Sequence, residues 1–196
     1  MGRRASHTDE EILRQVVLAA RRHGPRVTLA AIGREVGLTA ARLVQRFGSR
    51  DQLLATAESV ADRRRMAAIS AGLDLRRDPL GALTRRLASV ADRSARRLFL
   101  LSKSYFFDPG HLATPEAAAE AREREEGYIE GFRRVLEAAV TAKQLKRGAD
   151  LRALARAINI TWVGTYTSWA YAPVGSIRTL VVRDLEHLLA PYRARR

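Results

Sequence analysis

Hydrophobic side chains recur at helical spacing along most of the chain. No segment keeps the period-two alternation that indicates a strand. The pattern therefore predicts an all-α protein, with helices separated by short polar turns. The helices are expected at about 9–23, 29–36, 40–47, 50–71, 79–108 (one bent helix or two), 115–147, 151–171 and from 177 to near Pro191.

Residues at the helix ends support these boundaries. Thr8 and Ser49 each open a capping box, in which Ser or Thr is followed three residues later by Glu or Gln. Gly24 and Pro25 end the first helix, since glycine suits a C-terminal cap and proline cannot continue a helix. Gly148 is expected to end the helix that begins at 115.

Two short helices near the N-terminus form the most informative stretch. Thr28 caps the first of them, and Thr39 caps the second. Gly37 breaks the apolar pattern between them, and Leu43 and Phe47 continue it in the second helix. Two helices of about two turns joined by a glycine-bearing turn are typical of a helix-turn-helix.

Composition narrows the class of protein. The chain has 196 residues, 46% of them apolar and 29% charged, which is enough for a packed core. It has no apolar run of the roughly 18 residues that cross a bilayer, no apolar N-terminal segment and no cysteine. We therefore expect a cytoplasmic protein without a membrane segment, disulfide or thiolate metal site.

No chemistry of catalysis or metal binding is evident. None of the four histidines lies four residues from another, so we expect no metal. Phosphate-loop, nucleophile-elbow, dinucleotide and paired-carboxylate motifs are missing, so we expect neither an enzyme nor a cofactor. The interleaved Glu and Arg residues of 116–126 are interpreted as a solvated helix face.

The charge balance favours an anionic partner. The net charge is +14, and residues 1–50 hold 10 Arg against 4 acidic residues. Nucleic acid is the first candidate, although an Arg-rich composition also arises in GC-rich genomes. Arg3 and Arg4 belong either to a disordered terminus or to a basic arm that reaches DNA.

The N-terminal quarter resembles the tetracycline-repressor (TetR) family of bacterial transcription regulators. The residues that carry the resemblance are His23-Gly24, Thr28, Ile32 to Thr39, Leu43, Phe47, Gly48 to Asp51 and Leu53-Leu54. The resemblance implies a homodimer whose last two helices pair across the dimer axis. It also implies a DNA-binding domain at residues 1–50 and an effector and dimerisation domain at 51–196, with a linking helix at about 50–71.

One departure from the family pattern lies in the second helix of the motif. The family commonly has a tyrosine followed by aromatic or histidine residues before the phenylalanine, and this chain has Val44, Gln45 and Arg46 there. A frequent phosphate contact is thereby lost, which Arg42 and Arg46 could replace. The base sequence that the chain recognises cannot be inferred.

The candidate DNA-binding residues follow from helix geometry. In the second helix of the motif, Leu43 and Phe47 face the core, which leaves Arg and Gln side chains for base edges in the major groove. The helix N-termini at Thr28 and Thr39 favour phosphate. The candidates are Arg3, Arg4, Thr28, Thr39, Ala40, Arg42, Gln45, Arg46 and Arg50; the alternative is that the threonines are only caps and the arginines only solvated surface.

The helix at 151–171 is apolar on nearly all sides, which suggests burial against both its own domain and a partner subunit. We assign its small residues to a dimer interface and its aromatic residues to the subunit core and a ligand cavity; the reverse assignment is the rival. The predicted interface comprises Ala153, Ala157, Gly164, Ser168, Leu180, Val181, Leu185 and Leu188. The predicted ligand site comprises Phe106, Tyr128, Trp162, Tyr166 and Trp169, with plain core packing as the alternative.

The sequence thus predicts a ligand-responsive repressor that binds a pseudo-palindromic double-stranded operator as a dimer and is released by a small organic effector. The first alternative is an all-helical small-molecule-binding protein or enzyme that retains the N-terminal fold. The second is a helical adaptor that acts through the Glu/Arg face of 116–126.

Overall fold

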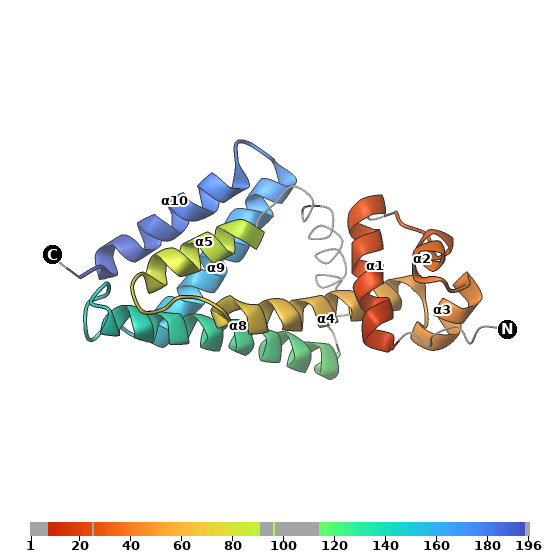
Figure 1. Cartoon of the computed structure of the whole chain (residues 1–196), viewed down its shortest axis with the longest axis horizontal. Helices are drawn as coiled ribbons and strands as arrows, with labels where there is room; N and C mark the ends of the chain where they lie inside the picture. The colour runs from red at the N-terminus through yellow and green to blue at the C-terminus, as the bar shows by residue number, and fades with distance from the viewer. Residues whose placement is uncertain (1–7, 25, 91–95, 97–113, 195–196) are drawn as a thin grey trace. The chain divides into compact units, whose positions relative to one another are not determined.

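The structure, a computed structural model, describes residues 8–24, 26–90, 96 and 114–194. The predicted all-α class is confirmed over these residues: they form helices, with a single isolated β-bridge between Leu145 and Arg193. The helices (Figure 1) are α1 (Asp9–His23), α2 (Leu29–Val36), α3 (Ala40–Phe47), α4 (Arg50–Ser70), α5 (Pro79–Val90), α8 (Pro115–Thr141), α9 (Leu151–Tyr171) and α10 (Ile177–Leu189), followed by the short 3-10 turn η1 (Ala190–Tyr192).

The chain divides into two compact units, one of residues 1–64 and 94–114, the other of residues 65–93 and 115–196. The division falls within α4, a continuous helix that also runs through the domain boundary predicted at residue 50. That boundary remains a prediction. The region between α5 and α8, where the sequence predicts further helix and places Phe106, lies outside the described residues.

The core of the first unit forms where the apolar faces of α1, α2 and α3 meet the start of α4. Ile12, Val16, Ile32, Leu43 and Leu53 are each at most 1% exposed. Ile12 and Val16 are four residues apart, the interval that places side chains on one face of α1. Burying five such side chains supplies on the order of 10 kcal/mol of hydrophobic stabilisation, at about 2 kcal/mol each before entropy is counted.

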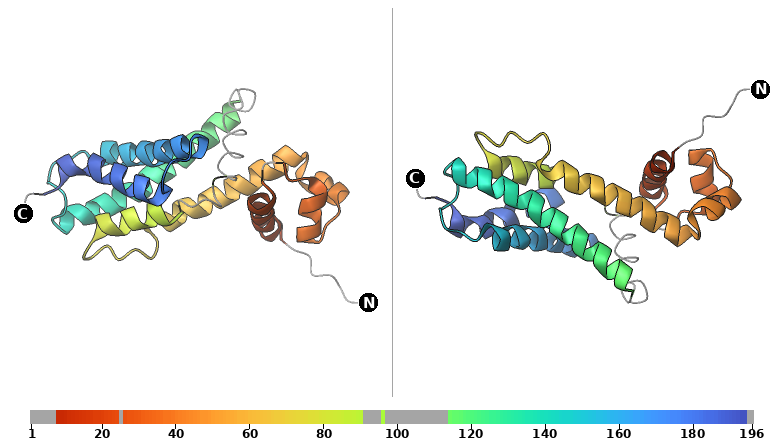
Figure 2. Two further views of the ribbon diagram at one scale, coloured as in Figure 1. Left: turned by 90° about the horizontal axis from the view of Figure 1, so that it is seen from above. Right: turned by 90° about the horizontal axis from the view of Figure 1, so that it is seen from below.

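The second unit is a bundle of α5, α8, α9 and α10. Figures 1 and 2 show α9 alongside both α8 and α10, with α5 against α8 and α10. The core contains Leu83, Phe132, Leu136, Ile158 and Leu185, all at most 1% exposed. The apolar stripes in the sequence therefore become the shared interior of the four helices.

Capping chemistry placed most helix ends correctly. The Thr8 box is formed, with the Glu11 amide 3.2 Å from Thr8 Oγ1 and the Thr8 amide 2.9 Å from Glu11 Oε2. The Ser49–Gln52 box is formed in the same way. The bounds of α1, α2, α3 and α9 agree with the sequence prediction, because each of these helices begins at a side chain that accepts a backbone amide.

The predicted end of α8 at Gly148 is wrong. The helix ends at Thr141, and Lys143 takes the left-handed conformation (φ 56°) that normally belongs to glycine. The Gln144 amide then donates to the carbonyl of Ala139 at 2.8 Å, as in a Schellman cap. Because a lysine occupies the capping position, no glycine marks the end, and Gly148 instead supplies a turn in the following loop.

Asp78 ties the start of α5 to the turn after α8. Its Oδ1 accepts from the Gly81 amide and from Gln144 Nε2, both at 2.9 Å, and Gln144 Oε1 accepts from the Leu80 amide at 3.0 Å. The hydrogen bond from Gln144 is the main cause that holds the pKa of Asp78 below its ordinary value. Glycine at position 81 leaves room for this carboxylate, since an added Cβ would lie 1.9 Å from Asp78 Oδ2.

Among the described residues, no helix combines the length and apolar character that a bilayer crossing requires. The same residues contain no group of three His, Asp or Glu side chains arranged to hold a metal ion.

Candidate functional site

The turn between α2 and α3 depends on two glycines. Gly37 ends α2 in the left-handed conformation (φ 70°), where a side chain would be strained. Gly33 lies inside α2, where an added Cβ would lie 2.4 Å from the carbonyl oxygen of Leu38. The Leu38 amide donates to the Gly33 carbonyl at 3.0 Å. This close contact of the turn with α2 sets where α3 begins.

Thr28 and Thr39 act as N-caps, as predicted. Thr28 Oγ1 accepts from the Ala31 amide at 3.1 Å, and Thr39 Oγ1 accepts from the Arg42 amide at 3.2 Å. Each cap satisfies the third amide of its helix, which leaves the first two for water or an anion. A phosphate group suits both positions, because the positive end of each helix dipole lies there.

The solvent side of α3 presents the predicted readout residues together. Arg42, Gln45 and Arg46 are exposed, whereas Leu43 is fully buried. Ala40 is half-buried at the first helical position. This face therefore offers guanidinium and amide donors on one side of a helix whose other side is held in the core.

Val44 is a surface residue that the prediction missed. It is 45% exposed and follows buried Leu43 on α3. An exposed apolar side chain among Arg and Gln suits contact with a thymine methyl group. Its place next to buried Leu43 already indicated that it could not face the core, since neighbouring helix positions point about 100° apart.

The two arginines of this face differ in their contacts. Arg46 Nε donates to Asp9 Oδ1 at 2.5 Å, and its guanidinium lies 5.7 Å from the Phe47 ring centroid. The Arg42 side chain makes no hydrogen bond or ion pair with the residues that the structure describes. Arg42 is thus ready to bind an external group, whereas Arg46 must share or leave Asp9.

Arg50 has a structural contact that changes its interpretation. Its Nε donates to the Val27 carbonyl at 2.6 Å, and Nη1 donates to Asp51 at 2.6 Å. The bond to Val27 connects the start of α4 to the segment before α2. Arg50 therefore supports the position of the helix-turn-helix, whatever it contributes to phosphate binding. Arg3 and Arg4 lie outside the described residues.

Glu35 connects α1 to α2 from the far side of the motif. It pairs with Arg22, and its Oε1 lies 2.7 Å from His23 Nε2. The carboxylate is only 19% exposed, so the pair is partly shielded from solvent. Together with the Arg50 bonds, it braces α2 from both ends.

The small residues of α9 lie on its outer side. Ala153, Gly164 and Ser168 are exposed and Ala157 is half-buried, whereas Tyr166 and Trp169 are buried. Ile160, on the same outer side, is 59% exposed. The subunit thus leaves uncovered the face that the sequence assigns to a partner, and that assignment remains a prediction.

The assignment for α10 needs correction. Val181 and Leu185 are each 1% exposed within the single subunit, so they have no surface to give to a partner. Sequence periodicity located the apolar stripe of α10, but it could not tell whether the stripe packs within its own subunit or against a partner subunit. Leu180 and Leu188 are half-buried at the edge of this stripe and remain interface candidates.

A polar contact joins the same two helices. Thr165 of α9 donates to Asp184 of α10 at 2.7 Å. Burial raises the pKa of Asp184, but the bonds from Thr165 and Arg183 outweigh burial and hold the pKa below its ordinary value. Asp184 therefore stays ionised beside the outer face of α9.

The predicted ligand residues form two aromatic pairs in the second unit. The Tyr128 and Trp162 ring centroids are 5.8 Å apart, and those of Tyr166 and Trp169 are 6.0 Å apart. The ring centroid of Tyr128 is also 6.2 Å from that of Phe132. The structure thus brings four of the five predicted residues into the bundle, and Phe106 lies outside the described residues.

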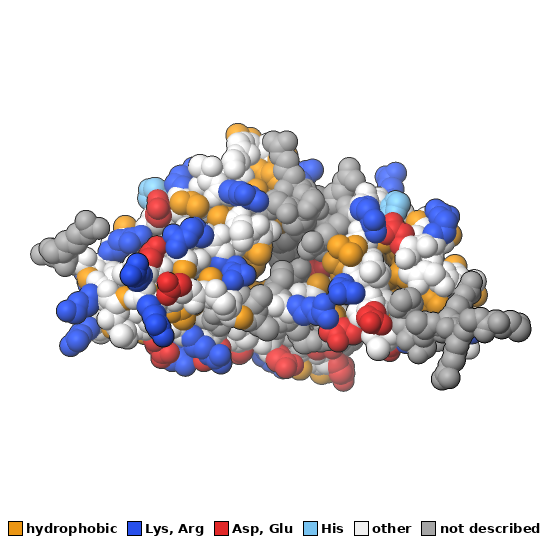
Figure 3. All heavy atoms as spheres, viewed as in Figure 1, with side chains coloured by type: hydrophobic (Ala, Val, Ile, Leu, Met, Phe, Trp, Pro, Cys, Tyr) orange, Lys and Arg blue, Asp and Glu red, His pale blue; other side chains and the backbone are white. Residues whose placement is uncertain are grey.

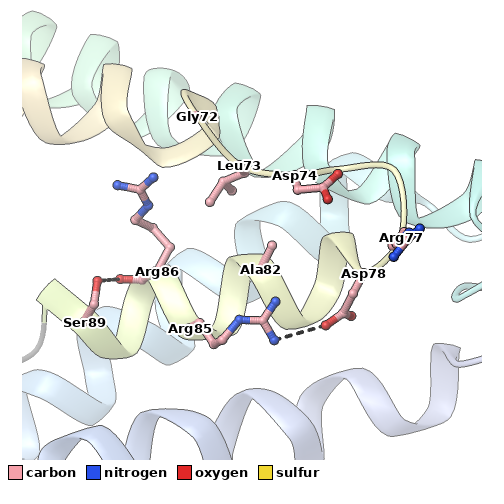
Figure 4. Close-up of a pocket in the computed structure, with 9 residues that line it drawn as sticks. All are labelled: Gly72, Leu73, Asp74, Arg77, Asp78, Ala82, Arg85, Arg86 and Ser89. Carbon is pink, nitrogen blue, oxygen red and sulfur yellow. Dashed lines mark hydrogen bonds and ion pairs between the residues drawn. The ribbon is translucent and has the colours of Figure 1, made fainter.

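An open groove lies elsewhere in the second unit (Figure 4). It has a volume of about 520 Å³ and lies between α5 and the loop before it. Arg85 points to Asp78, with its Nη1 3.1 Å from Asp78 Oδ2, and Arg86 donates to the Ala71 carbonyl at 3.0 Å. None of the four predicted aromatic residues that the structure describes lines this groove.

Positive charge is not confined to the helix-turn-helix. On the face shown in Figure 3, Lys and Arg side chains are scattered over both units among acidic ones. On α8, Glu130 is paired with Arg133 and Arg134, and the bond from Arg133 above all lowers the pKa of Glu130 to about 2. Net charge alone therefore does not locate the site, and the argument for it rests on α2 and α3.

The sequence matches no protein-family model and no curated protein. Solved structures match along nearly the whole chain. The SmeT–triclosan complex is 20% identical with a TM-score of 0.69, over 95% of this chain and 92% of that one; SmeT is the repressor of the Stenotrophomonas maltophilia multidrug efflux pump SmeDEF. A TetR transcription regulator from Haloarcula marismortui is 16% identical with a TM-score of 0.68, over 94% and 97% of the two chains.

A third match is the fatty acid degradation regulator FadR from Bacillus halodurans, at 17% identity and a TM-score of 0.65, over 94% of this chain and 99% of that one. The chain thus has the fold of helix-turn-helix transcription regulators. More narrowly, it has the fold of the TetR-family regulators, as the resemblance of residues 8–54 implied.

Proposed function

We propose that the chain is a TetR-family transcription regulator: a homodimeric repressor that binds a pseudo-palindromic operator and is released by a small organic effector. The fold supports the family, and the exposed face of α3 supports DNA binding. Arg42, Val44 and Gln45 stand free of the core there, on a helix whose position is braced by the turn glycines. That face is the observation on which the proposal chiefly rests.

The proposed mechanism uses two copies of this helix. In a symmetric dimer, the two α3 helices enter successive major grooves, about 34 Å apart. The effector binds in the second unit and stabilises a conformation whose helix spacing no longer fits the operator, because it binds that conformation better. The complex of SmeT with triclosan supports a small organic molecule as the ligand class.

The DNA-binding face can be tested with Arg42→Ala and Gln45→Ala. Duplexes are first selected from a random library with the wild-type protein, and binding to selected and scrambled duplexes is then measured at several salt concentrations. We expect each variant to lose roughly 5- to 150-fold of its preference, at about 1–3 kcal/mol for each base contact. All forms should bind less tightly as salt rises.

Arg147→Ala is the matched control. Arg147 is exposed in the loop after α8, in the second unit, and its loss removes the same charge. It should leave the preference unchanged. If Arg42→Ala and Gln45→Ala also keep the full preference, α3 is not the recognition helix. If the wild-type protein binds small molecules but no DNA even at low salt, the alternative of a ligand-binding protein or enzyme is favoured.

The dimer can be tested through the outer face of α9. Ile160→Glu places a charge on this face, where the apolar side chain is 59% exposed in the single subunit. We expect light scattering to give a dimer mass for the wild-type protein at micromolar concentration and a monomer mass for the variant, since a buried unpaired charge costs several kcal/mol or more. Leu18→Glu, at a 41% exposed position of α1, should remain a dimer. A monomeric wild-type protein would refute the interface.

A further inference from the structure

Two buried polar atoms on α9 have no hydrogen-bond partner among the residues that the structure describes. They are the indole nitrogen Nε1 of Trp162 and the amide oxygen Oδ1 of Asn159, each with less than 1 Å² accessible. Buried polar atoms in native proteins are nearly always hydrogen-bonded, so an orphaned one needs an explanation. One of these atoms is a donor and the other an acceptor.

The two atoms belong to one site. Asn159 and Trp162 are three residues apart on α9, so their side chains share a face of the helix. The Trp162 ring lies 5.8 Å from the Tyr128 ring of α8, with an angle of 59° between the planes. Tyr166 follows one turn later on α9 and is 6% exposed. Trp162 Nε1 thus belongs to a ring that packs on Tyr128, and Asn159 lies one turn before it on the same face of α9.

Three other polar side chains of α9 are hydrogen-bonded within the protein, so the orphaned pair is not a general feature of this helix. The second tryptophan, Trp169, donates its Nε1 hydrogen to the Gly175 carbonyl at 3.2 Å. Thr165 donates to Asp184, and Thr167 donates to the Val163 carbonyl at 2.7 Å. The fold completes the hydrogen bonds of these residues and leaves Asn159 and Trp162 open.

We infer that the effector of the proposed regulator is an uncharged, ring-containing molecule with both a hydrogen-bond acceptor and a donor. Trp162 Nε1 donates to the acceptor, Asn159 Oδ1 accepts from the donor, and the Tyr128 and Trp162 rings contact the ring of the ligand. The inference rests on the proposed ligand-responsive function and specifies the class of its ligand.

The expectation that the ligand is uncharged follows from the residues around the site. An ion buried without a partner is strongly disfavoured, and the rings that the structure places here, those of Tyr128, Phe132 and Trp162, carry no charge. Phenols and primary amides fit this description. An internal water could also use a donor and an acceptor, and the experiment separates water from ligand.

Three probes of nearly the same size distinguish the two hydrogen bonds. 2-Naphthol offers an acceptor and a donor, 2-methoxynaphthalene offers only an acceptor, and 2-methylnaphthalene offers neither. Equilibrium dialysis against the full chain gives each dissociation constant. Since each neutral hydrogen bond contributes about fivefold, we expect 2-naphthol to bind on the order of 20-fold more tightly than 2-methylnaphthalene, with the ether between them.

Two variants assign each gain in affinity between the probes to one residue. Trp162→Phe keeps a ring and removes the N–H, so it should abolish the advantage of the ether over 2-methylnaphthalene. Asn159→Leu removes the acceptor, so it should abolish the advantage of 2-naphthol over the ether. Ratios between probes for one protein, compared across variants, cancel differences in probe hydrophobicity and in overall pocket quality.

Trp169→Phe is the matched control, because its N–H is already bonded within the protein. It should keep both ratios. A wild-type protein that binds none of the probes, or variants that keep the wild-type ratios, would overturn the inference and favour a buried water. The probe measurements contain no DNA, so they are independent of operator binding. If the chain binds its operator but shows no probe preference, only this inference is contradicted. If it shows the probe preference but binds no operator, only the proposed regulator function is contradicted.

Discussion

Substituting Gly33 by alanine tests whether the contact between α2 and its turn positions α3. An alanine Cβ would lie 2.4 Å from the Leu38 carbonyl oxygen, and ordinary contacts of this kind begin near 3.4 Å. The turn must therefore move by about 1 Å. The Leu38 amide, which donates to the Gly33 carbonyl at 3.0 Å, moves with it.

The magnitude follows from three contributions. Overpacking costs about 1–3 kcal/mol and a weakened hydrogen bond about 1 kcal/mol, while alanine gains about 1 kcal/mol over glycine inside a helix. We expect a net loss of about 1–3 kcal/mol in the free energy of unfolding, measured by urea denaturation. We also expect weaker binding to the selected duplex, because α3 begins directly after Leu38 and Thr39.

Gly37→Ala is the control for this experiment. Gly37 has φ 70° with no atom within 4 Å of an added Cβ, so alanine there costs only backbone strain of about 1–2 kcal/mol. Both variants lose stability, but only Gly33→Ala forces the turn away from α2. If Gly33→Ala matches the wild-type protein in both stability and duplex affinity, the contact does not position α3.

Two further predictions concern stability. Lys143→Gly should raise the free energy of unfolding by about 1 kcal/mol in urea denaturation, because glycine takes φ 56° without strain; an unchanged value would show that the end of α8 is not strained. Gln144→Leu should lower stability most at neutral pH. The folded pKa of Asp78 is depressed chiefly by Gln144, so its contribution is present above the ordinary pKa and is lost as pH falls through the folded value. The difference between variant and wild type should therefore shrink below about pH 4, at the ordinary pKa of Asp; a constant difference from pH 7 to pH 3 would contradict this role of Asp78.

The sequence by itself determined the helix-turn-helix. The bounds of α1, α2 and α3 follow from caps at Thr8, Thr28 and Thr39 and from apolar residues three or four apart, and all of these are local interactions. The exposure of Arg42 and Gln45 follows as well, because Leu43 on the same short helix must face the core.

The tertiary structure decided the properties that depend on distant neighbours. Lys143 takes the capping conformation that glycine usually holds, so a prediction that placed the end of α8 at a glycine was wrong. Arg50 bonds to Val27 and Arg46 to Asp9, and neither pairing is visible in the spacing of the sequence.

Burial was the other quantity that sequence could not supply. The periodicity of α10 located an apolar stripe, but only the packing of α9 against it showed that Val181 and Leu185 face their own subunit. Trp162 and Trp169 are the same residue type on one helix, and only the structure shows which indole N–H has a partner. Helix caps and apolar periodicity depend on residues that are close in the sequence, whereas hydrogen-bond partners and burial depend on which segments the fold brings together.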